Sequence, residues 1–409
     1  MIELGEAKAF VLGSVGALEP RDVAISEACG CVVAESVVAV EAVPGFTNSS
    51  MDGFALRSGD TARGATRLSV VGSIHAGDAP TRHLESGQAM RIMTGAPLPS
   101  GADCVCMIEE TVVDEAGVVI PRTIAAGEFV RRAGDDIAVG RVLFSPGDVL
   151  NPSSVGVLAG QGLPTVRVRP RPRVGVLSTG NELVSTGEAL APGQIRDLNR
   201  PLLLALLDES GFTPVDLGNA RDTPDAIAES LRHGVASCDA VVTTGGVSVG
   251  DVDFVKLVIA ELGGDDARWM QVAIKPGKPF AFSVVGPRRV PLFGLPGNPV
   301  STRVSFELFV RPALRKMAGH RVIERLAMDA VLDEALEKPS DGKVHLVHVN
   351  IGWGDDGRVH VVDARRRGSH LLNAVAGANA IAVVIEGTSF DVGDVIRVIV
   401  LDPNSLGAP

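Results

Sequence analysis

The run RVGVLSTGNEL, residues 173–183, opens the segment that determines the fold, because an apolar strand passes directly into a polar turn that contains glycine. A helix is expected next, since Asn199 can cap its first turn, Pro201 suits that turn and Gly211 ends it. Further strands over TPVDLG, DAVVTTGG and VPLFGL alternate with further helical patterns. This alternation predicts a doubly wound parallel α/β domain over residues 173–325.

The flanking sequence predicts a multidomain α+β protein. Residues 44–140 are glycine-rich with short alternating segments, which is typical of a small β-rich domain. In residues 326–409, HLVHVNIGW and GRVHVVDAR flank the turn GDDG, so a hairpin within a small C-terminal β-barrel is expected. Residues 1–43 and 141–172 are assigned to an elongated α/β connecting domain. The run VRVRPRPRV (166–174) is interrupted by prolines, so we interpret it as a connector and not as a central strand.

Composition narrows the class of protein. The chain has 409 residues and a formal net charge of −11, which argues against general binding to nucleic acid or to anionic membranes. No apolar run is long enough for a transmembrane helix, and the acidic start MIELGEAKAF lacks signal-peptide features, so a cytoplasmic protein is expected. The two C-x-C pairs lie in apolar runs and are interpreted as buried thiols, since zinc-type spacing is absent.

Three glycine-containing loops follow strands of the predicted α/β domain. They are STGNEL (178–183), TTGGVSVGDVD (243–253) and GLPGNPVS (294–301). In such a sheet, ligands bind at the carboxyl ends of the strands, and glycines let backbone N–H groups approach an anion. The three loops therefore predict a site for a phosphate-bearing ligand.

Lysines flank a Pro-Gly turn in the same domain. The segment KPGKP lacks the Ser or Thr of a Walker motif, but Lys275 and Lys278 can converge on a phosphate or another oxyanion. A solvated turn is the alternative interpretation.

Acidic residues also follow these strands. Carboxylates beside phosphate-binding loops indicate Mg²⁺, which takes oxygen ligands and neutralises phosphoryl charge. The candidates are Glu182, Asp222, Asp251 and Asp253. Capping of the following helix is the alternative for Asp251 and Asp253, and shaping of the turn RDTP is the alternative for Asp222.

Six sequence blocks carry a resemblance to a known family. They are FTNSSMDGFALR (46–57), RIMTGAPLPSGADCVCMIEE (91–110), STGNEL, TTGGVSVGDVDF, IKPGKPFAF (274–282) and GLPGNPVS. In this order they resemble the signature motifs of molybdopterin molybdenumtransferases, the MoeA family, which is similar to the C-terminal half of gephyrin. The tail GSHLLNAVAGANAIAVVIEGTSFDVGDVIRV also fits the last domain of the family.

The resemblance implies an elongated homodimer with four domains per subunit. It implies transfer of molybdenum from molybdate to the dithiolene of adenylylated molybdopterin, with release of AMP and a requirement for Mg²⁺. The active site is expected between the α/β domain of one subunit and the small β domain of the other. A molybdopterin adenylyltransferase and apo-molybdoenzymes are the expected further partners, with no nucleic acid and no membrane.

The resemblance and the loop patterns described above together give the candidate site residues. The catalytic candidates are Asp52, Glu182, Asp222, Asp253 and Lys275, of which Glu182, Asp222 and Asp253 are the candidate metal ligands. The candidate substrate-binding residues are Thr94, Arg131, Asp136, Gly245, Gly246, Ser248, Lys278, Pro296, Gly297, Asn298, Pro299 and Ser369. Turn chemistry is the alternative for Asp52 and Thr94. The family pattern departs at Gln271, where some members have a basic residue, so one cationic contact is lacking.

Two other functions stay open at this level. One is the related molybdopterin adenylyltransferase, whose members are usually a single compact domain. The other is a non-catalytic carrier or scaffold. The flanking β domains favour molybdenum transfer over the first, and the cluster of acidic residues in the α/β domain argues against the second.

Overall fold

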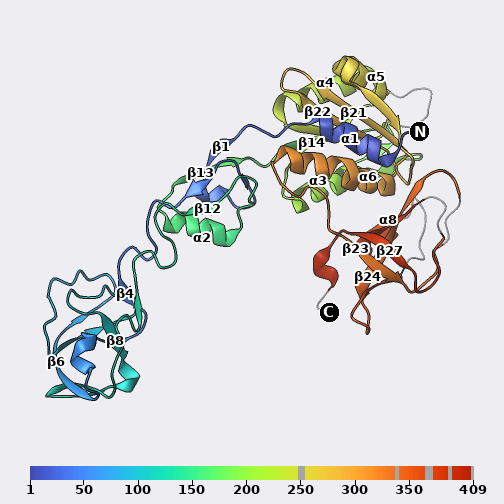
Figure 1. Ribbon diagram of the computed structural model, residues 1–409. Helices are drawn as coiled ribbons and strands as arrows, with labels where there is room; N and C mark the ends of the chain where they lie inside the picture. The colour runs from blue at the N-terminus through green and yellow to red at the C-terminus, as the bar shows by residue number, and fades with distance from the viewer. Residues whose placement is uncertain (247–253, 337–339, 364–371, 386–388, 407–409) are drawn as a thin grey trace.

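The computed structural model describes residues 1–246, 254–336, 340–363, 372–385 and 389–406. Four units form an elongated molecule (Figure 1), in which a small β unit lies at one end and a slender connecting unit joins it to an α/β unit. A β-barrel lies beside the α/β unit at the other end (Figure 1). Among the described residues, no helix has the length and apolarity to span a membrane.

A six-stranded sheet forms the centre of the α/β unit. Its order is β17 (Thr213–Ala220), β14 (Arg173–Thr179), β18 (Ala240–Thr244), β22 (Val290–Leu295), β21 (Pro279–Val285) and β19 (Arg268–Gln271). The first four strands are parallel, as the alternating sequence pattern predicted. Strand β21 is antiparallel to β22, because a short turn returns the chain from β21 directly into β22. Strand β19 pairs antiparallel with β21 at the edge of the sheet.

Helices cover both faces of this sheet, which confirms the doubly wound arrangement. On one face lie α3 (Asn199–Glu209), α6 (Pro299–Ser305), a π-helical segment (Phe306–Val310) and α7 (Arg311–Met317), and on the other lie α4 (Pro224–Ser237) and α5 (Phe254–Gly263). Successive β14 side chains point to opposite faces, so Val176 packs with α3 and Leu177 packs with α4. Thr223 caps α4, because its side chain accepts a hydrogen bond from the Ala226 backbone N–H.

The predicted cap of the preceding helix is wrong. Asn199 is the first residue of α3, and Leu198 occupies the cap position without a side-chain hydrogen bond. The amide of Asn199 is instead bonded to two loops of the site described below.

The connecting unit differs from its prediction in two places. Helix α1 (Leu4–Ser14) packs through Ala7 and Val11 into the core of the α/β unit. The assignment of residues 1–43 to the connecting unit therefore does not hold for this helix. The prediction that 166–174 contains no central strand is also wrong. Strand β13 (Thr165–Arg169) is the middle strand of the sheet β1-β13-β2, because the prolines follow it and remove none of its ladder hydrogen bonds.

The small β unit contains a second six-stranded sheet. Its order is β8 (Cys104–Met107), β5 (Gly53–Leu56), β7 (Gln88–Ile92), β6 (Thr66–Ile74), β10 (Gly117–Ile120) and β9 (Val112–Asp114). Cys104 and Cys106 are free, buried thiols in its core, as predicted. Gly53 is required by close packing, since a Cβ there would lie 1.9 Å from the carbonyl oxygen of Cys106.

Five strands close the predicted barrel. They pair in the order β24 (Val344–Trp353), β25 (Val359–Asp363), β23 (Ala327–Leu332), β27 (Val395–Val400) and β26 (Ala380–Val384), which returns to β24. The pairing of β24 with β25 confirms the predicted hairpin. Strand β20 (Ile274–Lys275) pairs with the start of β24, so the lysine turn of the α/β unit also contacts the barrel.

A buried ion pair joins the barrel to the α/β unit. Glu307, whose side chain is 1% exposed, accepts from Arg325 Nε at 2.9 Å and from its Nη2 at 3.1 Å. Arg325 also donates to the Leu401 carbonyl at 2.8 Å, and Arg303 lies 3.4 Å from the same carboxylate. Glu307 therefore neutralises two guanidinium groups at this junction.

Replacement of Glu307 by Ala should lower the free energy of unfolding by about 3 kcal/mol, because two largely buried guanidinium groups lose the buried carboxylate between them and, among the described residues, only Arg325 keeps another, Glu209 at 3.8 Å. Urea unfolding followed by tryptophan fluorescence measures the change. The matched control is Arg232→Ala, which removes an exposed pair with Glu261 and should cost less than about 1 kcal/mol. Equal effects of the two substitutions would contradict this assignment.

Candidate active site

The three predicted loops meet at one edge of the α/β sheet. They follow β14, β18 and β22, which are neighbouring parallel strands, so their carboxyl ends lie side by side. The Gly245 backbone N–H donates to the Leu295 carbonyl at 3.3 Å. A Cβ at Gly245 would lie 2.8 Å from the carbonyl oxygen of Thr179, and a Cβ at Gly297 would lie 3.7 Å from the Cα of Gly245. Glycine at 245 thus allows the loop after β18 to approach the loop after β14 closely, and the loop after β22 lies in van der Waals contact with it.

Hydrogen bonds hold two of these loops together. Asn199 Nδ2 donates to Thr244 Oγ1 at 2.9 Å and to the Gly297 carbonyl at 2.8 Å. Thr244 Oγ1 in turn donates to the Pro296 carbonyl at 3.2 Å. The sequence pattern missed this role of Asn199, because a polar residue at the start of an apolar helix has the same local signature as a cap.

The predicted residues Pro296, Asn298 and Pro299 shape the start of α6. Thr302 Oγ1 donates to the Pro296 carbonyl at 2.6 Å, and Asn298 accepts from the backbone N–H of Val300 at 3.3 Å. Pro299 is the first residue of α6, a position where its missing N–H costs nothing. The loop is thereby kept in one conformation beside Gly245 and Gly246, which end the described part of the loop after β18.

Two predicted metal ligands lie on adjoining loops. Glu182 follows β14 and Asp222 follows β17, the neighbouring strand. Asn181 accepts from the backbone N–H of Asp222 at 3.2 Å, which joins the two loops. The Glu182 carboxylate folds over Gly180, where a Cβ would lie 2.6 Å from its Oε2.

The donor chemistry of these carboxylates fits a hard cation. Glu182 is exposed and Asp222 is half-buried, and within the described residues neither takes part in a salt bridge. Magnesium is commonly held by one or two carboxylates together with water. No group of three or more His, Cys, Asp or Glu among the described residues could hold a metal. The third predicted ligand, Asp253, lies outside the described residues, as do Ser248 and Ser369.

The lysine turn packs against α6. Gly277 has a φ of +102°, and a Cβ there would lie 3.2 Å from the Ser305 hydroxyl oxygen. Lys275, which ends β20, is exposed, and Lys278 is half-buried. Neither ammonium group forms an ion pair within the part of the chain that the structure describes, so both are available to an anion.

The remaining predicted residues lie in the small β unit. Asp52 Oδ1 accepts from the Thr94 backbone N–H at 2.6 Å and from its hydroxyl at 2.7 Å. These bonds, and the nearby Arg91, hold the pKa of the Asp52 carboxyl below its ordinary value. The structure thus brings Asp52 and Thr94 together and keeps the carboxylate charged.

Two further predicted residues flank this pair. Arg131, in β11 (Val130–Arg131), pairs with Asn48 in β4 (Asn48–Ser49). The loop that carries Thr94 lies on the other side, since the Gly95 backbone N–H donates to the Ser49 carbonyl at 2.8 Å. Asp136 lies further along, where its N–H donates to the Val43 carbonyl at 3.0 Å. Asn48 is buried, and its Oδ1 has no described partner, a feature that the sequence pattern missed.

The two groups of predicted residues do not meet within one chain. The small β unit and the α/β unit lie at opposite ends of the connecting unit (Figure 1). A single chain therefore carries two separate groups of candidate residues, which are called half-sites below.

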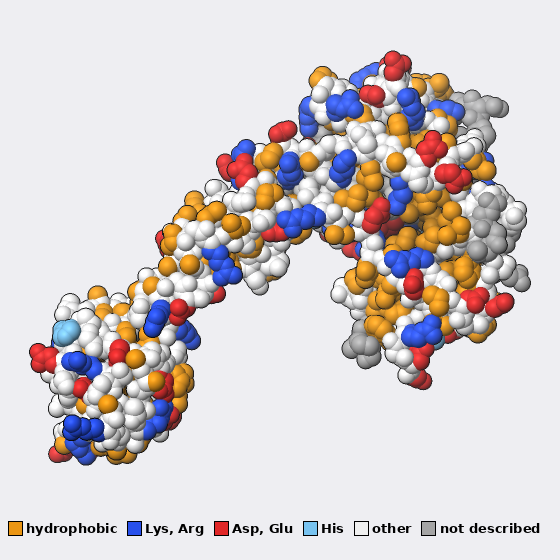
Figure 2. All heavy atoms as spheres, in the orientation of Figure 1, with side chains coloured by type: hydrophobic (Ala, Val, Ile, Leu, Met, Phe, Trp, Pro, Cys, Tyr) orange, Lys and Arg blue, Asp and Glu red, His pale blue; other side chains and the backbone are white. Residues whose placement is uncertain are grey.

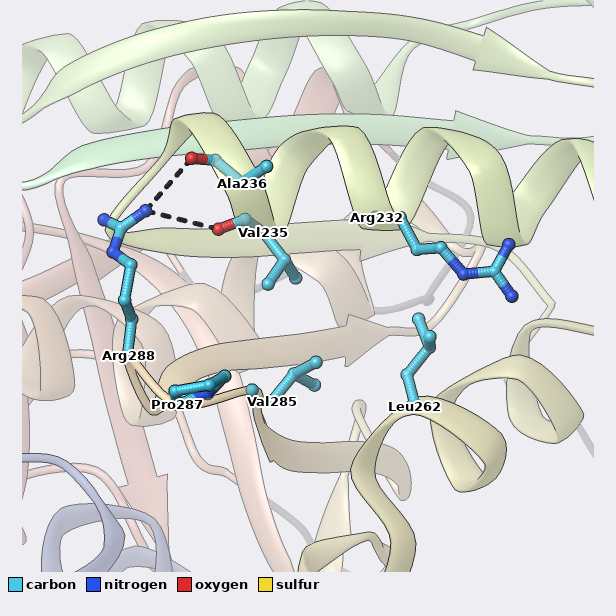
Figure 3. Close-up of a pocket in the computed structure, with 8 residues that line it drawn as sticks. Arg232, Val235, Ala236, Leu262, Val285, Pro287 and Arg288 are labelled. Carbon is cyan, nitrogen blue, oxygen red and sulfur yellow. Dashed lines mark hydrogen bonds between the residues drawn. The ribbon is translucent and has the colours of Figure 1, made fainter.

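An apolar groove elsewhere in the α/β unit is not part of either half-site. It has a volume of about 230 Å³ and lies between α4, α5 and the turn that joins β21 to β22. Figure 3 shows Arg288 in this turn, where it donates to the carbonyls of Val235 and Ala236 at the end of α4. Because β22 begins here, the groove lies at the amino ends of the parallel strands, whereas the glycine loops lie at their carboxyl ends.

Replacement of Thr94 by Val should raise the pKa of Asp52 part of the way to its ordinary value, because the hydroxyl donor is lost and the backbone donor stays. Carbon NMR of the Asp52 carboxyl during a pH titration measures this shift. Because the folded-state pKa is lowered, these bonds stabilise the fold above the ordinary pKa and are lost as the pH falls through the folded value. An unchanged titration in Thr94→Val would show that the hydroxyl makes no such bond.

Comparison with known proteins agrees with this division into units. Residues 2–162 match the model of the MoeA N-terminal region (domain I and II), residues 175–316 match a probable molybdopterin binding domain, and residues 330–401 match the MoeA C-terminal region (domain IV).

Whole-chain relatives extend these matches. The molybdopterin molybdenumtransferase of Haemophilus influenzae is 35% identical over 88% of this chain and 88% of its own length. The enzyme of that name from Bacillus subtilis is 33% identical over 94% of this chain and 90% of its own length. The crystal structure of the molybdopterin biosynthesis MoeA protein from Pyrococcus horikoshii superposes with a TM-score of 0.82 and 30% identity, covering 98% of this chain and 99% of that one. The chain therefore belongs to the MoeA family of molybdopterin molybdenumtransferases.

Proposed function

We propose that this chain inserts molybdenum from molybdate into adenylylated molybdopterin, releasing AMP and forming the molybdenum cofactor. The observation that carries the proposal is the convergence of three glycine loops and a lysine turn at one edge of the α/β sheet. Relatives of this name over most of the chain support the same reaction.

Both substrates are anions, and the chain carries a net charge of −11. The global field therefore repels them, and local positive groups must hold them together. Lys275 and Lys278 supply two such charges, and Arg131 supplies one from the small β unit. The loops that carry Gly245, Gly246 and Gly297 have no side chain at these positions, so a phosphate can approach their backbone closely, and the N–H groups of Gly246 and Gly297 are the donors that we propose for it.

The carboxylates account for a proposed magnesium requirement. Glu182 and Asp222, with Asp253, would hold Mg²⁺ beside the phosphates. When bound, the ion would supply Lewis-acid stabilisation of negative charge on the phosphoanhydride. The chain itself orients the substrates: the glycine loops hold the phosphate and the lysine turn holds the oxyanion.

The separation of the two half-sites supports a homodimer in which one subunit completes the site of the other. Asp52, Thr94, Arg131 and Asp136 would then face the α/β unit of the partner. The family resemblance implies the same arrangement, and the extended connecting unit gives the small β unit the reach it needs (Figure 1).

An exposed apolar face on the connecting unit fits such an assembly. Strands β3 (Val37–Val38) and β12 (Val142–Phe144) form a two-stranded ribbon in which Val38 lies opposite Val142. Val38 is 42% exposed and Val142 is 53% exposed, and the adjoining Val40 and Val139 are more exposed still. Figure 2 shows hydrophobic side chains gathered on this unit. Exposed apolar patches of this kind mark protein contacts.

The two competing functions account for fewer features of this chain. An adenylyltransferase would need only the α/β unit, whereas the family matches also cover both flanking regions. A carrier or scaffold would not need carboxylates, glycine loops and a lysine turn at the same end of the α/β sheet. A cytoplasmic location fits the proposal, with a molybdopterin adenylyltransferase supplying the substrate and apo-molybdoenzymes receiving the product.

Replacement of Asp222 by Ala should reduce molybdate-dependent AMP release about a hundredfold, because a ligand of the cation beside the phosphates is lost. Reconstitution of an apo-molybdoenzyme is the second readout. The control is Asp265→Ala. Asp265 is an exposed aspartate before β19, and β19 is the edge strand opposite β17, which Asp222 follows. Wild-type turnover in folded Asp222→Ala protein would remove this residue from the site.

Replacement of Val142 by Glu should convert dimers to monomers, because it places a charge in the apolar face. Sedimentation velocity measures the change in mass. Val395→Glu, at a similarly exposed valine of the barrel, is the control and should stay dimeric. A Val142→Glu protein of unchanged mass would show that this ribbon is not the interface.

A further inference from the structure

Asn199 joins two substrate-facing loops to a helix that itself carries no predicted site residue. It lies at the first position of α3, 9% exposed, below the loops that follow β18 and β22. Both bonds of its Nδ2 group go to these loops, one to the Thr244 hydroxyl and one to the Gly297 carbonyl. A single side chain therefore connects the loop of Gly245 with the loop of Gly297.

The direction of the hydrogen bonds requires an amide donor at this position. Thr244 uses its own proton toward the Pro296 carbonyl, so its oxygen must accept from Asn199. The carbonyl of Gly297 can only accept. A carboxylate of the same shape would offer no donor to the Gly297 carbonyl, and Thr244 could bond to it only by giving up its own bond to the Pro296 carbonyl.

The side chain of Asn199 bonds to the two loops and not to the start of its own helix. The Oδ1 atom of Asn199 is buried and has no hydrogen-bond partner in the described structure, although a helix start nearby offers backbone donors. An unpaired buried carbonyl costs stability. The side chain is therefore oriented for its two loop contacts and not for capping α3.

We propose that Asn199 is a positioning residue, which sets the spacing between the two glycine loops, after β18 and after β22, that receive the phosphates. This inference rests on the proposed function. Loss of the Asn199 amide should therefore misplace the two loops relative to each other. A displacement of about 1 Å at a reacting site lowers the rate or the affinity by a large factor.

Steady-state kinetics with adenylylated molybdopterin separate this role from a purely structural one. Asn199→Ala should raise the KM for adenylylated molybdopterin about tenfold and lower kcat less than threefold, because phosphate binding is weakened before the chemical step. Asn199→Asp keeps the side-chain volume but loses the donor, so it should be impaired at least as much. A wild-type KM in Asn199→Asp would overturn the proposal.

Asn379 provides a matched control in the barrel. Its amide also makes two hydrogen bonds, both of 2.8 Å, to the N–H and the carbonyl of Ile351. Asn379→Ala should lower stability to a similar extent and leave the KM unchanged. An equal rise of KM in both variants would show that lost stability, and not loop spacing, is responsible.

A binding measurement distinguishes failure of this inference from failure of the proposed function. Calorimetric titration of the wild-type protein with adenylylated molybdopterin, without molybdate, should show binding that weakens about tenfold in Asn199→Ala. Amide hydrogen exchange at Gly245 should accelerate in Asn199→Ala and not in Asn379→Ala. Absence of binding to the wild type would contradict the proposed function, whereas equal binding by wild type and Asn199→Ala would contradict only the role of Asn199.

Discussion

The parallel alignment of β14, β18 and β22 is the constraint on which the rest of the α/β unit depends. Val176 lies opposite Val242, which in turn lies opposite Phe293, so the three strands end at the same edge. Parallel neighbours require crossover helices, and these helices bury both faces of the sheet. The loops between strand and helix are then forced together at one edge. Glycine at 245 permits the close approach to the loop after β14, and the buried amide of Asn199 holds the loops after β18 and β22 together.

A second constraint is the length of the molecule. The connecting unit separates the small β unit from the α/β unit (Figure 1). Under the proposed function, a site that uses residues from both units would be completed by a second copy. Asp52 and Thr94, which form a preorganised, charged pair on the small β unit, would then meet the partner's α/β unit, and the elongated shape would supply the reach.

Local patterns in the sequence were sufficient for much of this architecture. Alternation of apolar strands with capped helices predicted the doubly wound unit, and the GDDG turn predicted the barrel hairpin, because both depend on contacts close in sequence. Three features depend on distant contacts and were mispredicted. Helix α1 packs against residues near 310, β13 gains its neighbours from residues near 22 and 33, and Asn199 bonds to residues 244 and 297. Nothing in the local sequence distinguishes an asparagine that caps its helix from one that, like Asn199, bonds to two distant loops.

Subunit complementation tests the shared site most directly. Asp52→Ala and Asp222→Ala proteins, each inactive alone, would be mixed, exchanged and assayed for molybdate-dependent AMP release. A mixed dimer contains one site with both residues intact and one site with neither, so the account predicts recovery of about a quarter of wild-type activity after random exchange. No recovery after verified exchange of subunits would contradict a site built from the small β unit of one chain and the α/β unit of the other.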